Sequence, residues 1–379
     1  MTVNQVYSLL NDTATQCFGA GALATLDLEN MLALRETVSA FGSDKFLNAL
    51  VDRIGKTVLR TLDFTATFPK FLMDEFTFGA VLQKINVQPF SAVESKQWEV
   101  GDVGFTPNNF EIAKPTVLVD YFQTSNTWEV YVSIPDRIFM TAFDSATAMT
   151  AFITAIFDSM NTSLNIQLEN ETRLAILGMV GEKVHASNGC VDLLALYNDF
   201  AATPITTAAE AMHDKEFLRF AGMTIRNYIA YLGKPSVLYN VAGRVRATTR
   251  DNMHVLMLTE FESAYSSYVV SDTFQDIIRL PFYTSVEYWQ ATGNSAPNFD
   301  DCSAYDIEIP SDGTAVQGSG LVCMLCDREA IATGLFDRFS AADRNNRNRV
   351  TGYTEGVTIQ SIVDTSENCV CFFVVDQTP

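Results

Sequence analysis

In this 379-residue sequence, the residues whose types and spacing best suit metal binding or redox chemistry are two pairs of cysteines. The segment LVCMLCD at residues 321–327 contains Cys323 and Cys326, and the segment CVC contains Cys369 and Cys371. Four thiolates can bind Zn²⁺ in a tetrahedron. Zinc-ribbon pairs lie on tight turns, however, and LVCMLC has no Gly, Pro or Asn to form one. In a strand, residues three apart point to opposite faces. We therefore predict that Cys323 and Cys326 pack on opposite faces of a sheet, that CVC lies in a buried strand, and that no metal is bound.

Groups for acid–base or nucleophilic catalysis are sparse. The three histidines, His185, His213 and His254, stand in no recognisable catalytic spacing. His213 precedes Asp214, which is a possible dyad, but AMHDKEF is typical of the start of a helix. Neither GxSxG nor GxxxxGK[ST] occurs, and GAGALA at residues 19–24 matches the dinucleotide fingerprint loosely, after residues with a helical pattern. The sequence predicts no catalytic residue and no cofactor.

Two charged clusters are candidate binding sites. The segment FDDCSAYDIEIPSDG carries five carboxylates, but its spacing is not that of a calcium-binding loop, and a solvated loop is favoured over a weak cation site. The segment DRFSAADRNNRNRV carries four arginines, for which two interpretations weigh evenly: an exposed loop, or a docking patch for an acidic neighbouring subunit. These arginines are Arg338, Arg344, Arg347 and Arg349.

Composition limits the classes of function. Asp and Glu number 45 against 25 Lys and Arg, a net charge of −20. Tight nucleic-acid binding requires basic residues to neutralise phosphates, so this class is excluded, whereas an acidic surface past which nucleic acid slides is compatible. With 47% hydrophobic and 18% charged residues, the chain is expected to bury surface against copies of itself or other partners. Seven cysteines, no secretory signal pattern and no long apolar run favour a product made in a cytoplasm, neither exported nor inserted in a membrane.

Hydrophobic periodicity predicts the elements that would position these groups. A helix is expected at residues 43–62, followed by a two-stranded ribbon from about residue 81 to PTVLVDYF, with Lys96 and Trp98 near its tip. Such a ribbon has little core of its own and needs a neighbour to lie on. The segment WEVYVSI alternates as a strand. A helix over residues 146–180 would span roughly 50 Å, longer than a compact domain needs.

The remaining segments form a mixed region and a group of closing strands. Short helices are expected at CVDLLALYNDF and DKEFLRFAGMTIRNYIAYL, strands around SVLYN and HVLMLTEF, and an acidic, loop-rich stretch at residues 292–320. Strands are then expected near LVCMLC, GVTIQSIV and CVCFFVVD.

This order of elements resembles the major capsid proteins of tailed bacteriophages, which have the Hong Kong 97-like (HK97-like) fold. Local stretches resemble members from small short-tailed phages: VDLLALYNDF with DKEFLRFAGMTI, SDTFQDIIRLPFYTSVEYWQ, and CMLCDREAIA leading to TGYTEG. The resemblance extends from about residue 61 to the end of the sequence, and the order of the segments is stronger evidence than any one of them.

The resemblance implies an α+β, HK97-like fold in four parts. Residues 1–76 would form the N-terminal arm and 77–127 an extended β-ribbon loop. Residues 128–184 and 341–379 would form a peripheral domain with a long spine helix, and 185–340 a mixed α/β axial domain.

The resemblance also implies a structural protein rather than an enzyme. Copies would form pentamers and hexamers of an icosahedral head shell around double-stranded DNA, without sequence-specific binding, alongside portal and scaffolding proteins. The protein would be located in the virion after assembly in the host bacterial cytoplasm. Lys96, Trp98 and the four arginines would lie at subunit interfaces. Two alternatives are an encapsulin-like protein compartment and an enzyme with an unrecognised active site in residues 185–340.

Overall fold

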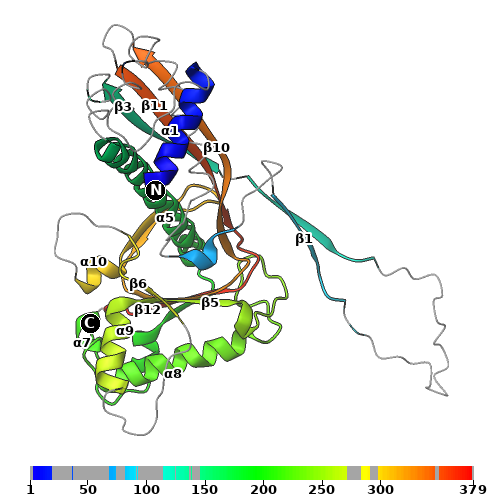
Figure 1. Ribbon diagram of the computed structural model, residues 1–379. Coiled ribbons are helices and arrows are strands. Elements are labelled where there is room, and N and C mark those ends of the chain that lie inside the picture. Colours follow the sequence, from blue (N-terminus) through cyan, green and yellow to red (C-terminus); the bar gives the residue numbers. More distant parts are fainter. Residues whose placement is uncertain are drawn as a thin grey trace. The chain divides into compact units, whose positions relative to one another are not determined.

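The fold is described from a computed structural model, shown in Figure 1. The residues that the structure describes are 3–18, 36, 68–73, 82–90, 92, 114–123, 125–135, 138, 146–270, 283–290, 298–345 and 350–377.

The chain forms two compact units, each built from separated segments. Unit 1 comprises residues 1–77, 125–172 and 333–361, and unit 2 comprises residues 78–124, 173–332 and 362–379. The helices are α1 (Val3–Phe18), α5 (Ala146–His185), α6 (Leu193–Asn198), α7 (Ala208–Ala211), α8 (Lys215–Leu232), α9 (Thr259–Tyr265) and α10 (Phe299–Ser303). The strands are β1 (Leu82–Val87), β2 (Val117–Phe122), β3 (Ser125–Pro135), β4 (Cys190–Asp192), β5 (Met253–Leu258), β6 (Thr284–Val286), β7 (Tyr305–Glu308), β8 (Ala315–Gly318), β9 (Leu321–Asp327), β10 (Ile331–Asn345), β11 (Val350–Val363) and β12 (Cys369–Phe373).

Unit 1 is a three-stranded sheet packed against the first part of α5. The strand order is β10-β11-β3, and β11 pairs antiparallel with β3 over eleven residues, from Val350↔Pro135 to Gln360↔Ser125. Spacing of four residues places Met160, Leu164 and Leu168 on one face of α5, because such residues lie above one another on a helix. Leu164 and Leu168 contact Val357 and Ile359 of β11, forming the core of this unit.

A buried carboxylate ties β3 to α5 within unit 1. Glu171 accepts a hydrogen bond of 2.8 Å from the indole Nε1 of Trp128 and two of 3.1 Å from the Asn126 amide. A buried carboxylate is costly unless its oxygens are satisfied, so these donors account for its position. The expected strand WEVYVSI and the expected long helix are both confirmed, and the helix continues to His185.

Unit 2 contains a five-stranded sheet in the order β4-β12-β9-β5-β6. Its two outer pairs are parallel and its two inner pairs antiparallel. The helix α8 buries Phe217, Leu218, Ala221 and Ile225, and begins at Asp214, whose carboxylate accepts a 2.7 Å hydrogen bond from the Phe217 amide. The sequence DKEFLRFAGMTIRNYIAYL is thus the predicted helix, with Asp214 as its N-cap rather than part of a catalytic dyad. None of the helices within the described ranges is both long and apolar enough to cross a bilayer.

Two expectations about local structure are wrong. SVLYN was expected to be a strand, but residues 236–240 form a bend and a turn with one isolated bridge, Ser236↔Arg246. Asn240 holds this turn by exchanging two 2.7 Å hydrogen bonds with the backbone of Arg244, a local pairing that competes with a strand. An exposed loop was one interpretation of the arginine segment, but Arg338 and Arg344 lie on β10, which ends at Asn345, whereas Arg347 and Arg349 lie outside the described residues. The helix expected at residues 43–62 lies outside the described residues.

Candidate interaction surface

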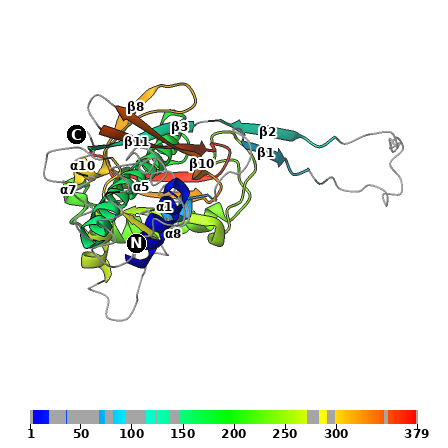
Figure 2. The ribbon, with the colours of Figure 1, turned by 45° about the horizontal axis from the view of Figure 1, so that its top comes forward.

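The expected ribbon is present, and its two faces differ sharply in character. β1 and β2 pair antiparallel in a register from Leu82↔Phe122 to Val87↔Val117 (Figure 2). Directly paired residues share a face. One face therefore carries Gln83, Ile85 and Val87 opposite Tyr121, Val119 and Val117, and the other carries Leu82, Lys84 and Asn86 opposite Phe122, Asp120 and Leu118.

The apolar face of the ribbon is exposed within the chain. Ile85 is 61% exposed, Tyr121 65% and Val119 39%. Val87 and Val117 are also exposed, and Phe90 follows just beyond β1. Adjacent exposed apolar side chains on one sheet face indicate a surface that another molecule covers. We call residues 85, 87, 117, 119 and 121 the ribbon face.

The opposite face of the ribbon is held to the rest of unit 2 by charge. Lys84 Nζ donates to Asp364 Oδ2 and to Glu367 Oε1, both at 2.8 Å, and lies 3.1 Å from Glu329 Oε2. Asp364 and Glu367 lie in the turn between β11 and β12, where both are almost fully buried. The ammonium therefore neutralises carboxylates that would be costly to bury alone.

A second cationic segment completes this charged cluster. Arg244 forms a two-pronged ion pair with Asp120 of β2, in which Nη2 lies 2.8 Å from Oδ1. Arg246 Nη2 lies 3.1 Å from Glu367 Oε1. The planar guanidinium matches a carboxylate in two places at once, which fixes orientation as well as distance. We call Lys84, Asp120, Arg244, Arg246, Asp364 and Glu367 the ribbon clamp.

The clamp shifts the pKa values of its members for identifiable reasons. Hydrogen bonding from Arg244 lowers the pKa of the Asp120 carboxyl. Burial alone would lower the pKa of Lys84, but hydrogen bonds and charge from Asp364 and Glu367 raise it above its usual value. Burial raises the pKa of Glu367, although Lys84 and Arg246 act in the opposite direction.

The cysteine segments occupy the middle of the unit 2 sheet. LVCMLCD is β9 and CVCFF is β12, both fully buried, as predicted. Cys323 pairs with Phe372, and Cys326 with Cys369. The odd spacing of Cys323 and Cys326 places them on opposite faces of the sheet, as expected. Among the residues that the structure describes, no cluster of three or more His, Cys, Asp or Glu is placed to hold a metal ion.

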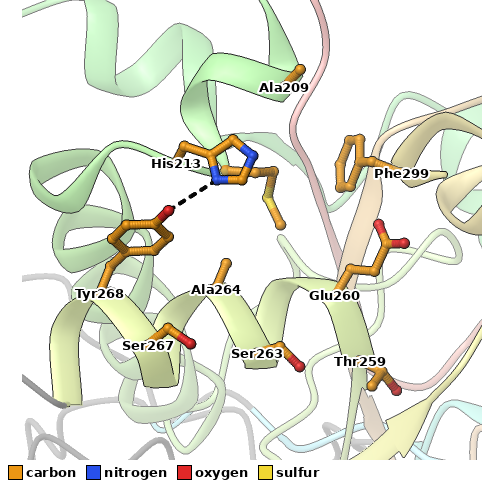
Figure 3. A pocket seen from close by; sticks show the side chains of 10 residues that line it. Ala209, His213, Thr259, Glu260, Ser263, Ala264, Ser267, Tyr268 and Phe299 are labelled. Atoms are coloured by element: carbon orange, nitrogen blue, oxygen red, sulfur yellow. Dashed lines mark hydrogen bonds between the residues drawn. The ribbon is translucent and has the colours of Figure 1, made fainter.

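A cavity of about 550 Å³ lies beside α9 in unit 2 (Figure 3). Its lining includes His213, whose Nδ1 lies 3.2 Å from the hydroxyl of Tyr268, and Glu260. Figure 3 shows the His213 ring turned toward Tyr268, with the Ser263 and Ser267 hydroxyls on the helix below. The hydrogen-bond partner of the His213 ring in this cavity is thus the Tyr268 hydroxyl.

The six residues expected at subunit interfaces fall largely outside the described part of the chain. Lys96, Trp98, Arg347 and Arg349 lie outside it altogether. Arg338 and Arg344 lie on β10, where only their backbone is described. The ribbon clamp was not foreseen. The alternation of Lys84 and Asn86 with Ile85 and Val87 was a signal for it, but the anionic partners stand some 280 positions away in the sequence.

Comparison with known proteins gives independent evidence for the family and the fold of this chain. Residues 20–373 match the family model described as Phi29-like phage major capsid protein. The fold is similar to a chain of the capsid structure of Staphylococcus phage Andhra, with 10% identity, a TM-score of 0.54, and coverage of 83% of this chain and 85% of that one. A chain in the structure of the head fiber and inner core protein gp22 of native bacteriophage P68 is also similar, with 10% identity, a TM-score of 0.52, and coverage of 81% and 84%. The sequence matches no curated protein significantly. The structural likeness confirms the expected α+β, HK97-like fold.

Proposed function

Since the chain belongs to the Phi29-like phage major capsid protein family, we propose that its copies assemble as pentamers and hexamers into an icosahedral head shell. This shell encloses the double-stranded DNA of a tailed bacteriophage. The protein is a structural component of the virion capsid, and assembly takes place in the cytoplasm of the host bacterium. Its role depends on contact between copies rather than on turnover of a substrate.

The ribbon carries the proposal. A two-stranded ribbon has too little core to be stable alone, and here its polar face is bound to its own unit while its apolar face is exposed. A protein that acts as a monomer is expected to bury the apolar face and expose the polar face, because apolar burial is the main stabilising contribution to folding. In a shell, a neighbouring copy covers the ribbon face. The clamp holds that face in a defined orientation before the neighbour arrives.

The remaining partners follow from charge and from the family. With a net charge of −20, an inner surface repels DNA phosphates, so packaged DNA stays mobile and is not bound sequence-specifically. Portal and scaffolding proteins are the other proposed partners, and membranes are not among them.

The four-part division also belongs to this proposal. It comprises the arm at 1–76, the extended loop at 77–127, the peripheral domain at 128–184 and 341–379, and the axial domain at 185–340. Within it, Lys96 and Trp98 contact a neighbour from the loop tip, and Arg338, Arg344, Arg347 and Arg349 pair with carboxylates of an adjacent copy.

Negative-stain electron microscopy of the expressed protein, alone and with its scaffolding partner, tests the proposal. The expected result is closed shells or rings of five and six subunits. Particles from infected cells should contain DNA that nuclease does not reach. A protein that stays monomeric under crowding and with its scaffold contradicts the proposal, and shells that enclose a protein cargo instead of DNA support an encapsulin-like compartment.

A further inference from the structure

Cys326 and Cys369 are direct partners across the antiparallel β9–β12 pair. Directly opposite residues have side chains on the same face of the sheet. Both side chains are almost completely buried, with exposed fractions of 1% and 0%. Neither has a role in the proposed assembly, and their separation by 43 positions conceals their proximity in the sequence.

The hydrogen-bond pattern shows which kind of pair this is. The Cys369 amide donates to the Tyr239 carbonyl at 2.9 Å, on the side away from β9, and the Asp327 amide donates to Asn368 at 2.9 Å. In an antiparallel ladder the two kinds of pair alternate, so Cys326↔Cys369 is a pair without mutual backbone hydrogen bonds. Such pairs have Cα atoms about 4.5 Å apart and the closer side chains. This lies within the range of about 4.4–6.8 Å that a disulfide spans.

A buried cation makes the two thiols unequal. Lys183 of α5 is fully buried, and its Nζ donates to the Tyr239 carbonyl at 2.7 Å and to Asn188 Oδ1 at 3.3 Å. Burial opposes ionisation of Cys369, but a hydrogen bond with Cys371 and the charge of Lys183 outweigh it and lower the pKa of the Cys369 thiol. Burial raises the pKa of Cys326. Cys369 is thus suited to be the attacking thiolate and Cys326 the resolving thiol.

We propose that Cys326 and Cys369 form a latent redox pair that hydrogen peroxide closes into a disulfide joining β9 to β12. The Cys369 thiolate attacks one peroxide oxygen, forming an S–O bond and breaking the O–O bond, and the departing hydroxide takes up a proton to leave as water. The Cys326 sulfur then attacks the Cys369 sulfur, forming the S–S bond and breaking the S–O bond, and the departing hydroxide takes the Cys326 thiol proton to leave as a second water. Two thiols are oxidised by two electrons in total, and one peroxide is reduced. Hydrogen peroxide is the chosen oxidant because a small, neutral molecule enters a buried apolar site more readily than a large or charged one.

Two other cysteines lie on this face, and although the Cys371 thiol hydrogen-bonds that of Cys369, backbone geometry favours Cys326 as the disulfide partner. Cys371 lies two positions from Cys369 on the same extended strand, where the chain holds the Cα atoms roughly 6–7 Å apart, at the upper limit of the disulfide range. Cys190 of β4 is paired with Cys371 rather than with Cys369. Cys323 lies on the same strand as Cys326 with the same burial but on the opposite face, so it is the matched control.

The test is a peptide map of the oxidised, folded protein. Reduced full-length protein is treated with hydrogen peroxide, the remaining thiols are blocked with N-ethylmaleimide in denaturant, and a non-reducing digest is analysed by mass spectrometry. The expected result is loss of two alkylatable thiols and one linked peptide pair containing Cys326 and Cys369. Cys323→Ala should give the same link. Cys326→Ala should lose it and accumulate a Cys369 sulfenic acid, detected as a dimedone adduct.

Each other outcome overturns the inference. A link from Cys369 to Cys371, or unreacted Cys326 and Cys369 while exposed Cys190 is oxidised, contradicts the assigned pair. Circular dichroism shows whether each variant is folded, and if one is not, the wild-type map alone decides. The inference concerns the sheet of a single chain, so it stands or falls separately from shell assembly.

Discussion

The Lys84 ammonium lies 2.8 Å from the Asp364 carboxylate, although 280 positions separate the two residues in the sequence. Lys84 belongs to the ribbon and Asp364 to the turn that precedes β12. This contact joins the ribbon to the C-terminal part of unit 2. The orientation of the ribbon therefore depends on the completed fold of unit 2.

Removal of the clamp cation should destabilise the protein. In Lys84→Met the stem length is kept, but Asp364 and Glu367 lose a cation while remaining buried. Removing one partner of a buried ion pair costs about 3–5 kcal/mol of stability. We expect a loss of about 3 kcal/mol, at the lower end of this range, because the Lys84 side chain is 21% exposed. Urea unfolding measures the change. The exposed Lys234→Met is the control and should alter stability by less than about 0.5 kcal/mol.

Acid should weaken the clamp through Asp120. Its pKa is lower in the folded protein than the ordinary value of 3.8, so its stabilising contribution is complete above that value and is lost as pH falls through the folded-state value. Asp120→Asn removes this carboxylate, so the loss of stability on acidification below about pH 4 should be smaller in the variant. Urea unfolding at a series of pH values tests this. Identical pH dependence in the two proteins would contradict the role assigned to Asp120.

A charge on the ribbon face should block assembly without unfolding the subunit. In Ile85→Asp the new carboxylate is solvated in the monomer, because this position is 61% exposed, but is desolvated beneath a neighbouring copy. We expect a circular dichroism spectrum and thermal midpoint close to those of the wild type, with shells absent in the microscope. Ile85→Val, which keeps the position apolar, should assemble. Normal shells from the Asp variant would show that no neighbour covers this face.

Substitution of Gly189 by alanine should destabilise the protein more than the same substitution at Gly313. Gly189 and Gly313 have φ of 70° and 74°, so alanine at either costs about 1 kcal/mol from backbone strain. An added Cβ at Gly189 would lie 2.6 Å from the Cys369 carbonyl oxygen, whereas at Gly313 nothing lies within 4 Å. We therefore expect Gly189→Ala to be less stable than Gly313→Ala by a further ~1–3 kcal/mol, as for other overpacked sites, measured by urea unfolding. Equal losses would rule out the steric contribution.

Local patterns predicted the elements well and their partners poorly. The spacing of Ile156, Met160 and Leu164 indicated the long helix, and alternation indicated β3 and the ribbon, because these signals depend only on nearby residues. Which face of the ribbon points inward could not be predicted from local sequence. Polarity alone favours burying Ile85 and exposing Lys84, and the reverse arrangement depends on Asp364 and Glu367, which are distant in the sequence.

The cysteines show the same limit. Strand parity correctly separated Cys323 from Cys326, since both lie in one strand. The pairing of Cys326 with Cys369 depends on the register between β9 and β12, which no pattern within either segment specifies. The turn at SVLYN was missed because the Asn240 side chain, rather than hydrophobic alternation, determines its conformation.

The position of β12 between β4 and β9 has a consequence for synthesis on the ribosome. β12 is an interior strand of the unit 2 sheet, but it is synthesised after the other strands of that sheet. The sheet therefore cannot form completely until residue 373 has left the exit tunnel. The acidic residues that hold Lys84 precede this strand by only a few positions and emerge almost as late. A polypeptide released before Asp364 therefore has neither a finished sheet nor the carboxylates that hold Lys84.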